Sequence, residues 1–251
     1  MSLINVIELC RKYSDEFSVE DISFDIEENG IYGFLGKSGS GKTLLCQMLT
    51  GASVPDDGVI YVKDRVLYKN QKQTASIKKK IGYVPQSFFY DKDATVMEIM
   101  DLIGGIRGID PDKRYRQIKE ALDLTGLALK TDTLAGDLTV SEKKRLSIAV
   151  SIIGNPDILI MDEPFAHLDT NEAEQVERLL GMLGKRKPVL MFTARAQYVE
   201  RLCVNTAFLH NGRLMLWENT AELLAKLKEN NLGGLAEALC ALNEDKEEEQ
   251  E

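Results

Sequence analysis

The sequence predicts an α/β fold built on a mostly parallel sheet. Three short and mainly apolar runs, at residues 31–35, 158–161 and 189–192, have the length and composition of strands buried on both faces. Helical patterns separate these runs, and alternation of strands with helices is typical of a parallel sheet covered by helices. The length of 251 residues is sufficient for one large domain with a hydrophobic core.

Composition and charge restrict the class of protein. Hydrophobic residues make up 44% of the chain and charged residues 28%, which is typical of soluble globular proteins. The net charge is −9, and residues 244–251 contain six acidic residues and one lysine. Nucleic-acid binding usually needs clustered lysine and arginine, so we expect no nucleic-acid partner. The four separated cysteines form no CxxC pair, which favours a reducing cytoplasm without a zinc site or disulfide framework.

The first strands are expected near the N-terminus. Apolar residues cluster at 4–7 and alternate over 22–26 before a turn at 27–30, the pattern of a half-buried sheet. We assign these strands to an N-terminal antiparallel β subdomain. The strand at 31–35 then leads into a glycine-rich loop at 36–41 and a helical pattern.

Helical periodicity dominates residues 94–138, where Val96, Ile99 and Met100 share one helical face. We interpret this segment as a helical subdomain inserted in the core at about 87–137. The elements expected after it are a helix at 141–153, a strand at 158–161, a helix at 171–183, a strand at 189–192, a hairpin turn at 211–212 and a helix at 220–228.

These elements define the expected domain organisation. One domain should span residues 1–228, followed by a C-terminal extension at 229–251. The acidic tail of that extension is too charged and too poor in aromatic residues to pack, so we expect it to be disordered. No apolar run approaches the about 18 residues needed to cross a bilayer, so we expect no direct membrane span.

A phosphate-binding loop lies between the predicted strand at 31–35 and the helix after it. Glycines in such a loop let backbone N–H groups point at phosphate oxygens, and the helix N-terminus adds partial positive charge. Lys42 would reach the β- and γ-phosphates, and the Thr43 hydroxyl would bind Mg²⁺. The residues that satisfy the pattern GxxxxGK[ST] are Gly36, Lys37, Ser38, Gly39, Ser40, Gly41, Lys42 and Thr43.

Two carboxylates follow the strand at 158–161. Asp162 would hold Mg²⁺, and Glu163 would polarise a water for in-line attack on a phosphate. Alone, two acids after an apolar strand usually mark only the end of that strand. Together with the phosphate loop, they predict nucleotide hydrolysis or a nucleotide-driven switch. The GTPase base-selecting string NKxD is absent from the sequence, which favours ATP.

These motifs, in this order, resemble the ATP-binding cassette (ABC) family over about residues 4–224, which implies a RecA-like P-loop NTPase core. Tyr83-Val84-Pro85-Gln86 resembles the Q-loop, whose glutamine touches the metal and the attacking water. Tyr13 stands where the family stacks an aromatic ring on adenine, and Asp169 matches the acid of the D-loop. The alternatives are a turn residue for Tyr13, an exposed loop amide for Gln86 and a helix N-cap for Asp169.

The sequence departs from the family at two places. Thr193-Ala194 replaces the usual Thr-His, so the imidazole that contacts the γ-phosphate and orders the catalytic carboxylate is missing. Loss of one such transition-state contact can cost about 10² to 10³ in rate. The segment matching the signature LSGGQ keeps a hydroxyl but loses both glycines, so we expect weaker capping of the γ-phosphate on the opposite subunit. Its residues are Leu138, Thr139, Val140, Ser141 and Glu142.

Within the family, the sequence looks most like the separate ATPase subunits of bacterial ABC-2-type exporters. The resemblance implies ATP and Mg²⁺ as cofactors, a separate transmembrane permease as partner, and a second ATP-binding subunit in a homo- or heterodimer. It also implies a cytoplasmic protein bound at the inner face of the cell membrane. Phe88, Phe89 and Tyr90 are candidates for the permease contact, with packing inside the helical subdomain as the alternative.

Three functions compete for this sequence. The first is an ATP-hydrolysing subunit that powers export, and the second is a regulatory or structural subunit that binds ATP but barely hydrolyses it. The intact Asp162-Glu163 pair favours the first, since a chain without hydrolytic duty has no need of a base beside the metal. The third, an ATPase acting on ribosomes or DNA, fits poorly with one uninterrupted cassette and an acidic tail.

Overall fold

The computed structural model describes residues 2–87 and 89–244, and its strands within those ranges form two sheets. The smaller sheet is antiparallel, in the order β2-β1-β4-β5, and contains the strands predicted near the N-terminus. Its strands are β1 (Ile4–Lys12), β2 (Ser18–Ile26), β4 (Asp57–Val62) and β5 (Arg65–Val66).

The larger sheet has the order β10-β9-β3-β8-β7-β6. Neighbouring strands from β9 to β6 run parallel, and β10 pairs with β9 antiparallel at the edge. The α/β fold class with a mostly parallel core sheet is thus confirmed. The strands are β3 (Gly30–Leu35), β6 (Ile81–Val84), β7 (Ile158–Asp162), β8 (Pro188–Thr193), β9 (Asn205–His210) and β10 (Arg213–Asn219).

Side chains alternate along the central strands and fill a core on each face of this sheet. In β8, Leu190 and Phe192 enter the core shared with the antiparallel sheet and α1 (Lys42–Leu49), while Val189 and Met191 enter the core on the other face. The Phe34 ring in β3 stacks on Phe192 with ring centroids 4.4 Å apart. The second face is covered by α6 (Thr170–Gly184), α7 (Ala196–Leu202), α8 (Thr220–Glu229) and α9 (Leu235–Glu244).

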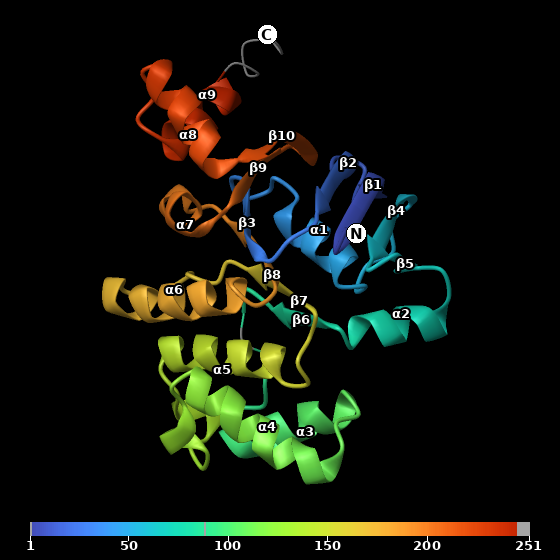
Figure 1. Cartoon of the computed structure of the whole chain (residues 1–251), viewed down its shortest axis with the longest axis vertical. Helices are drawn as coiled ribbons and strands as arrows, with labels where there is room; N and C mark the ends of the chain where they lie inside the picture. Colours follow the sequence, from blue (N-terminus) through green and yellow to red (C-terminus); the bar gives the residue numbers. More distant parts are fainter. Residues whose placement is uncertain (1, 88, 245–251) are drawn as a thin grey trace.

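A group of helices forms a third core at one end of the molecule (Figure 1). This group comprises α3 (Val96–Ile106), α4 (Pro111–Leu124) and α5 (Val140–Ile152). Thr95 begins α3 with a capping box to Glu98, and the Asp110-Pro111 pair begins α4 as N-cap and first residue. The subdomain boundaries at 87–137 stay a prediction, and α5 packs against this core and against β6.

The remaining α-helix of the described chain, α2 (Gln71–Lys78), follows β5 and precedes β6 in the sequence. The short helices η1 (Ala128–Lys130) and η2 (Ala135–Asp137) connect α4 to α5. Throughout the described residues, every helix is too short or too polar to cross a membrane.

The C-terminal extension contains a helix that the sequence analysis did not expect. Helix α9 lies beside α8 at the end of the molecule opposite α3 and α4 (Figure 1). Leu235, Ala238 and Leu239 are buried in the second core, and Glu200 on α7 accepts a 2.7 Å hydrogen bond from the amide of Leu235. The structure thus adds a packed helix to the extension, while the disorder expected of the acidic tail stays a prediction. The acidic tail beyond that helix lies outside the described residues.

This packing predicts that Leu235→Ala destabilises the protein. Leu235 is fully buried, so the change should lower the free energy of unfolding by about 2–4 kcal/mol through lost burial and a cavity. Urea unfolding followed by circular dichroism measures the difference. The matched control is Leu129→Ala at a 97% exposed position, which should change stability by less than about 0.5 kcal/mol. Equal effects of the two substitutions would contradict the packed position of α9.

Candidate nucleotide-binding site

The phosphate loop joins β3 to α1 and depends on glycine at two positions. Gly41, the N-cap of α1, has φ of 100°, a left-handed conformation that other residues adopt at a cost. A Cβ on Gly36 would lie 2.4 Å from Ser40 Oγ and 2.5 Å from the carbonyl oxygen of Leu209. No side chain caps the first amides of α1. The loop therefore leaves these N–H groups available to an anion.

A cleft of about 660 Å³ opens at this loop. It brings residues from the loop between β1 and β2, the phosphate loop and the segments that follow β6, β7 and β8 around one space. Of the predicted loop residues, Gly36, Lys37 and Ser40 are not among those that line it. The lining residues are Tyr13, Ser14, Glu16, Phe17, Ser38, Gly39, Gly41, Lys42, Thr43, Leu44, Gln47, Gln86, Asp162, Glu163 and Ala194.

Lys42 lies folded against the phosphate loop. Its Nζ donates hydrogen bonds to the carbonyl oxygens of Gly36 at 2.7 Å and Lys37 at 2.8 Å. The side chain is only 7% exposed, and burial lowers its pKa, an effect opposed by the nearby charges of Glu163 and Asp162. The negative charges around the ammonium group therefore offset part of the cost of burying it.

Thr43 and Asp162 meet at the floor of the cleft. The Thr43 hydroxyl donates a 3.0 Å hydrogen bond to Asp162 Oδ2, while the buried Oδ1 has no hydrogen-bond partner among the described residues. Burial raises the pKa of Asp162, although the hydrogen bond from Thr43 opposes this shift. Among the described residues, no three His, Cys, Asp or Glu side chains cluster as a metal site. Mg²⁺ is commonly held by one or two carboxylates together with phosphate oxygens, so the free Oδ1 beside a hydroxyl fits this ion.

Glu163 is held at the mouth of the cleft by the end of β8. Its Oε2 accepts a 3.0 Å hydrogen bond from the Thr193 hydroxyl, and its Oε1 accepts a 2.8 Å bond from the amide of Ala194. Its φ of 47° is a left-handed conformation that is uncommon outside glycine. Both carboxylate oxygens are therefore fixed although residue 194 has no imidazole.

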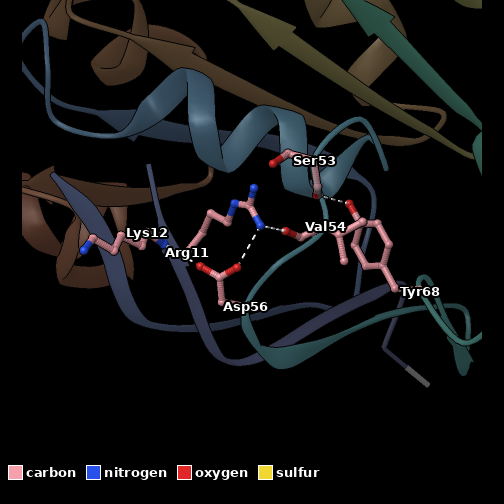
Figure 2. Close-up of polar contacts among 6 residues, drawn as sticks. All are labelled: Arg11, Lys12, Ser53, Val54, Asp56 and Tyr68. Carbon is pink, nitrogen blue, oxygen red and sulfur yellow. Dashed lines mark hydrogen bonds and ion pairs between the residues drawn. The ribbon is translucent and has the colours of Figure 1, made fainter. Parts of the chain in front are cut away.

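Tyr13 lies on the loop between β1 and β2, and its side chain is 73% exposed beside the cleft. The strand end before it is fastened by a polar network, which Figure 2 shows. Asp56 accepts hydrogen bonds from Arg11 Nη1 at 2.8 Å and from the amide of Lys12 at 2.7 Å, and Arg11 also donates to the carbonyl of Val54. The aromatic ring thus directly follows an anchored strand end. Gln86, after β6, lines the same cleft with an exposed side chain.

The signature segment lies outside this cleft. Thr139 caps α5 and exchanges hydrogen bonds with Glu142, so its hydroxyl is engaged at the helix start. Leu138 and Ser141 are buried, whereas Val140 is 52% exposed. These positions are compatible with the resemblance, which assigns the segment to the ATP of the opposite subunit.

Asp169 is also outside the cleft and is the N-cap of α6, where it forms a capping box with Glu172. It lines a separate hollow of about 500 Å³ together with Arg195. Arg195 therefore lines this second hollow and is not among the residues that line the nucleotide cleft.

Two residues that the sequence analysis did not assign contact the site. Thr193 holds Glu163, and Lys144 donates to the carbonyl oxygens of Gln86 and Glu163. The signals for Thr193 were its place in the Thr193-Ala194 pair and its position at the end of a strand parallel to the one that Glu163 follows. Lys144 gave no signal, because charged neighbours surround it in the sequence.

Fold and cleft together define a nucleotide-binding P-loop protein. The model of the family described as ABC transporter matches residues 19–166, more than half of the chain. The chain therefore belongs to the ABC transporter family, as an ATP-binding domain.

Similar proteins include the Nod factor export ATP-binding protein I of Rhizobium sp. (strain N33), with 32% identity over 81% of this chain and 66% of that protein. The bacitracin transport ATP-binding protein BcrA of Bacillus licheniformis is 29% identical over 85% of this chain and 69% of its own length. This chain thus spans about two thirds of these relatives. The solved structure of cbiO1 from Clostridium perfringens, described as part of the ABC transporter complex cbiONQ, matches with a TM-score of 0.77 and 27% identity, covering 90% and 91% of the two chains.

If Tyr13 stacks on a base, Tyr13→Ala should weaken ATP binding by fivefold to a hundredfold, since a base–aromatic stack contributes about 1–3 kcal/mol. Titration calorimetry with ATP and with tripolyphosphate measures the effect. Only ATP binding should weaken, because tripolyphosphate has no base. The control is Tyr115→Ala on α4, a residue 61% exposed. Equal losses for both ligands would instead identify Tyr13 as a turn residue.

The buried charge of Asp162 predicts a gain in stability for Asp162→Asn without magnesium. Since burial raises the pKa of Asp162, its ionised form destabilises the fold above that pKa, and the cost disappears as the pH falls below it. The variant should melt about 2–4 °C higher than wild type at about pH 7 in EDTA, and the difference should shrink in acidic buffer. The control is Asp123→Asn on the exposed surface of α4. A lower melting temperature for Asp162→Asn would contradict this prediction.

Proposed function

We propose that this chain hydrolyses Mg²⁺-ATP as a subunit of an export system and thereby powers a separate membrane permease. The proposal depends on one observation: two hydrogen bonds fix the carboxylate of Glu163 beside the phosphate loop. The export assignment is supported by the similar Nod factor export proteins. The similarity to the methionine import ATP-binding protein MetN 1 of Enterococcus faecalis is a reason to test the direction of transport.

In the proposed reaction, the amides of the phosphate loop bind the phosphates and Lys42 neutralises their charge. Thr43 and Asp162 would hold Mg²⁺, which would offset charge on the β- and γ-phosphates. Glu163 orients a water molecule and accepts its proton as the oxygen bonds to the γ-phosphorus. The bond from the γ-phosphorus to the bridging oxygen breaks, and ADP leaves with that oxygen and its electron pair. Gln86, at the edge of the cleft, would contact the water and the metal.

Ala194 lowers the expected rate but leaves the base in place. Its amide holds Glu163 Oε1, while no side chain from residue 194 can reach the γ-phosphate. Slow hydrolysis, accelerated by the permease or by a partner subunit, agrees with this arrangement. A purely regulatory ATP-binding subunit would gain nothing from two hydrogen bonds that orient a base.

A second ATP-binding subunit would complete the site. The exposed Val140 and the first turn of α5 would face the γ-phosphate bound by that subunit, and Asp169 would lie close to the same interface. Whether the pair is a homodimer or a heterodimer is decided by the assembly of the purified chain. In either case the proposed location is the inner face of the cell membrane.

The helical group would face the permease. Phe89 supports this orientation because it is 77% exposed, whereas Tyr90 is half-buried against the third core. Phe88, the third residue suggested for this contact, lies outside the described residues.

Steady-state hydrolysis of ATP, with and without the permease, tests the proposed function. Glu163→Gln should abolish turnover. Thr193→Val should reduce kcat by about tenfold to a hundredfold with little change in ATP affinity, because the carboxylate loses one of its two positioning contacts.

The matched control is Thr206→Val, since Thr206 is an equally buried threonine whose hydroxyl pairs with that of Thr220 at 2.8 Å. Turnover that does not differ between wild type and Glu163→Gln, with the permease present, would leave the chain as an ATP-binding regulator.

A further inference from the structure

Lys144 on α5 connects the two loops that carry the predicted catalytic residues. Its Nζ donates a 3.1 Å hydrogen bond to the carbonyl oxygen of Gln86 and a 3.3 Å bond to that of Glu163. The two acceptors are 77 positions apart in the sequence and follow the adjacent strands β6 and β7. One ammonium group therefore bridges the strand ends on which the Q-loop and the catalytic carboxylate depend.

Burial of this ammonium group is costly, because a lysine normally keeps its charge in water. The side chain of Lys144 is only 7% exposed. Among the described residues, no carboxylate lies within ion-pair distance of its Nζ, so main-chain carbonyls are its direct partners. A salt bridge therefore does not explain the burial of this lysine. Its two hydrogen bonds, which join the loops of Gln86 and Glu163, do.

Helix α5, which carries Lys144, contributes side chains to two hydrophobic cores. Leu146 and Ala149 on α5 are buried in the third core, whereas Ile148 enters the core beneath the parallel sheet. The adjacent Lys143 points elsewhere, since its Nζ donates to the carbonyl of Gly136 within the helical group at 3.0 Å. Lys144 thus meets the two loops where the helical group joins the sheet.

We propose that Lys144 is a positioning residue for ATP hydrolysis, and that its ammonium group holds the loops of Gln86 and Glu163 at a fixed separation. The proposal rests on the proposed function, in which both residues act on the attacking water. Lys144 acts through main-chain carbonyls, so its loss affects the placement of both side chains together. ATP binding is expected to change little, because Lys144 is not among the residues that line the cleft.

Kinetics of Lys144→Met provide the first test. Methionine keeps an unbranched side chain but cannot donate a hydrogen bond. We expect kcat to fall at least tenfold while the KM for ATP changes less than twofold, and Lys144→Arg to recover part of the loss because arginine can donate to both carbonyls. The matched control is Lys187→Met, which should retain the wild-type kcat. Lys187 is a partly buried lysine whose Nζ donates to the carbonyl oxygen of Pro156 at 2.6 Å, and it does not line the cleft. Melting temperatures of all variants show whether a loss of activity reflects unfolding.

Hydrogen exchange provides a second test that needs no turnover. With bound ATP in the Glu163→Gln background, Lys144→Met should increase amide exchange in peptides covering Gln86-Ser87 and residues 163–166, whereas Lys187→Met should not. If wild type shows no Glu163-dependent hydrolysis, the proposed function fails and exchange alone decides the role of Lys144. Exchange in both peptides that matches the Lys187→Met control would overturn the proposal, as would wild-type kcat in Lys144→Met.

Discussion

The parallel register of β3, β8 and β7 is the constraint on which the site depends. Leu35 pairs with Thr193, and Asp162 pairs with Phe192, so the three strands end at one edge of the sheet. The phosphate loop, the two acids and the Thr193 hydroxyl each follow or complete one of these strands. A slip by one residue would move each side chain to the opposite face and separate Glu163 from Thr193. The stacked rings of Phe34 and Phe192 strengthen this register from inside the core.

Electrostatics impose a second constraint near the same edge. Two lysines, Lys42 and Lys144, and the carboxylate of Asp162 are almost fully buried. Burial lowers the pKa of each lysine and raises that of Asp162, while the opposite charges around them counter these shifts. The opposite charges offset part of the cost of burial, but burial remains the largest effect on each of the three groups. The geometry of the site is thus maintained by a balanced group of charges as well as by packing.

The sequence predicted the central strands and the phosphate loop well, because short apolar runs and a glycine-rich string are local patterns. Helix α9 was missed since the acidic end of the chain dominated its interpretation, although Leu235, Ala238 and Leu239 follow helical spacing. Contacts between distant segments were harder to predict. Lys144 and Glu163 meet only after α5 has packed on the sheet, and no spacing along the chain encodes that contact.

The main-chain contact at residue 194 makes this part of the site tolerant of sequence change. The bond to Glu163 comes from an amide N–H, which every amino acid except proline provides. Drift at this position can therefore remove the side chain's contribution to the γ-phosphate while preserving the orientation of the carboxylate. Under the proposed function, the two tasks that the family gives to one histidine are separable, so such a chain can lose speed here without losing the reaction.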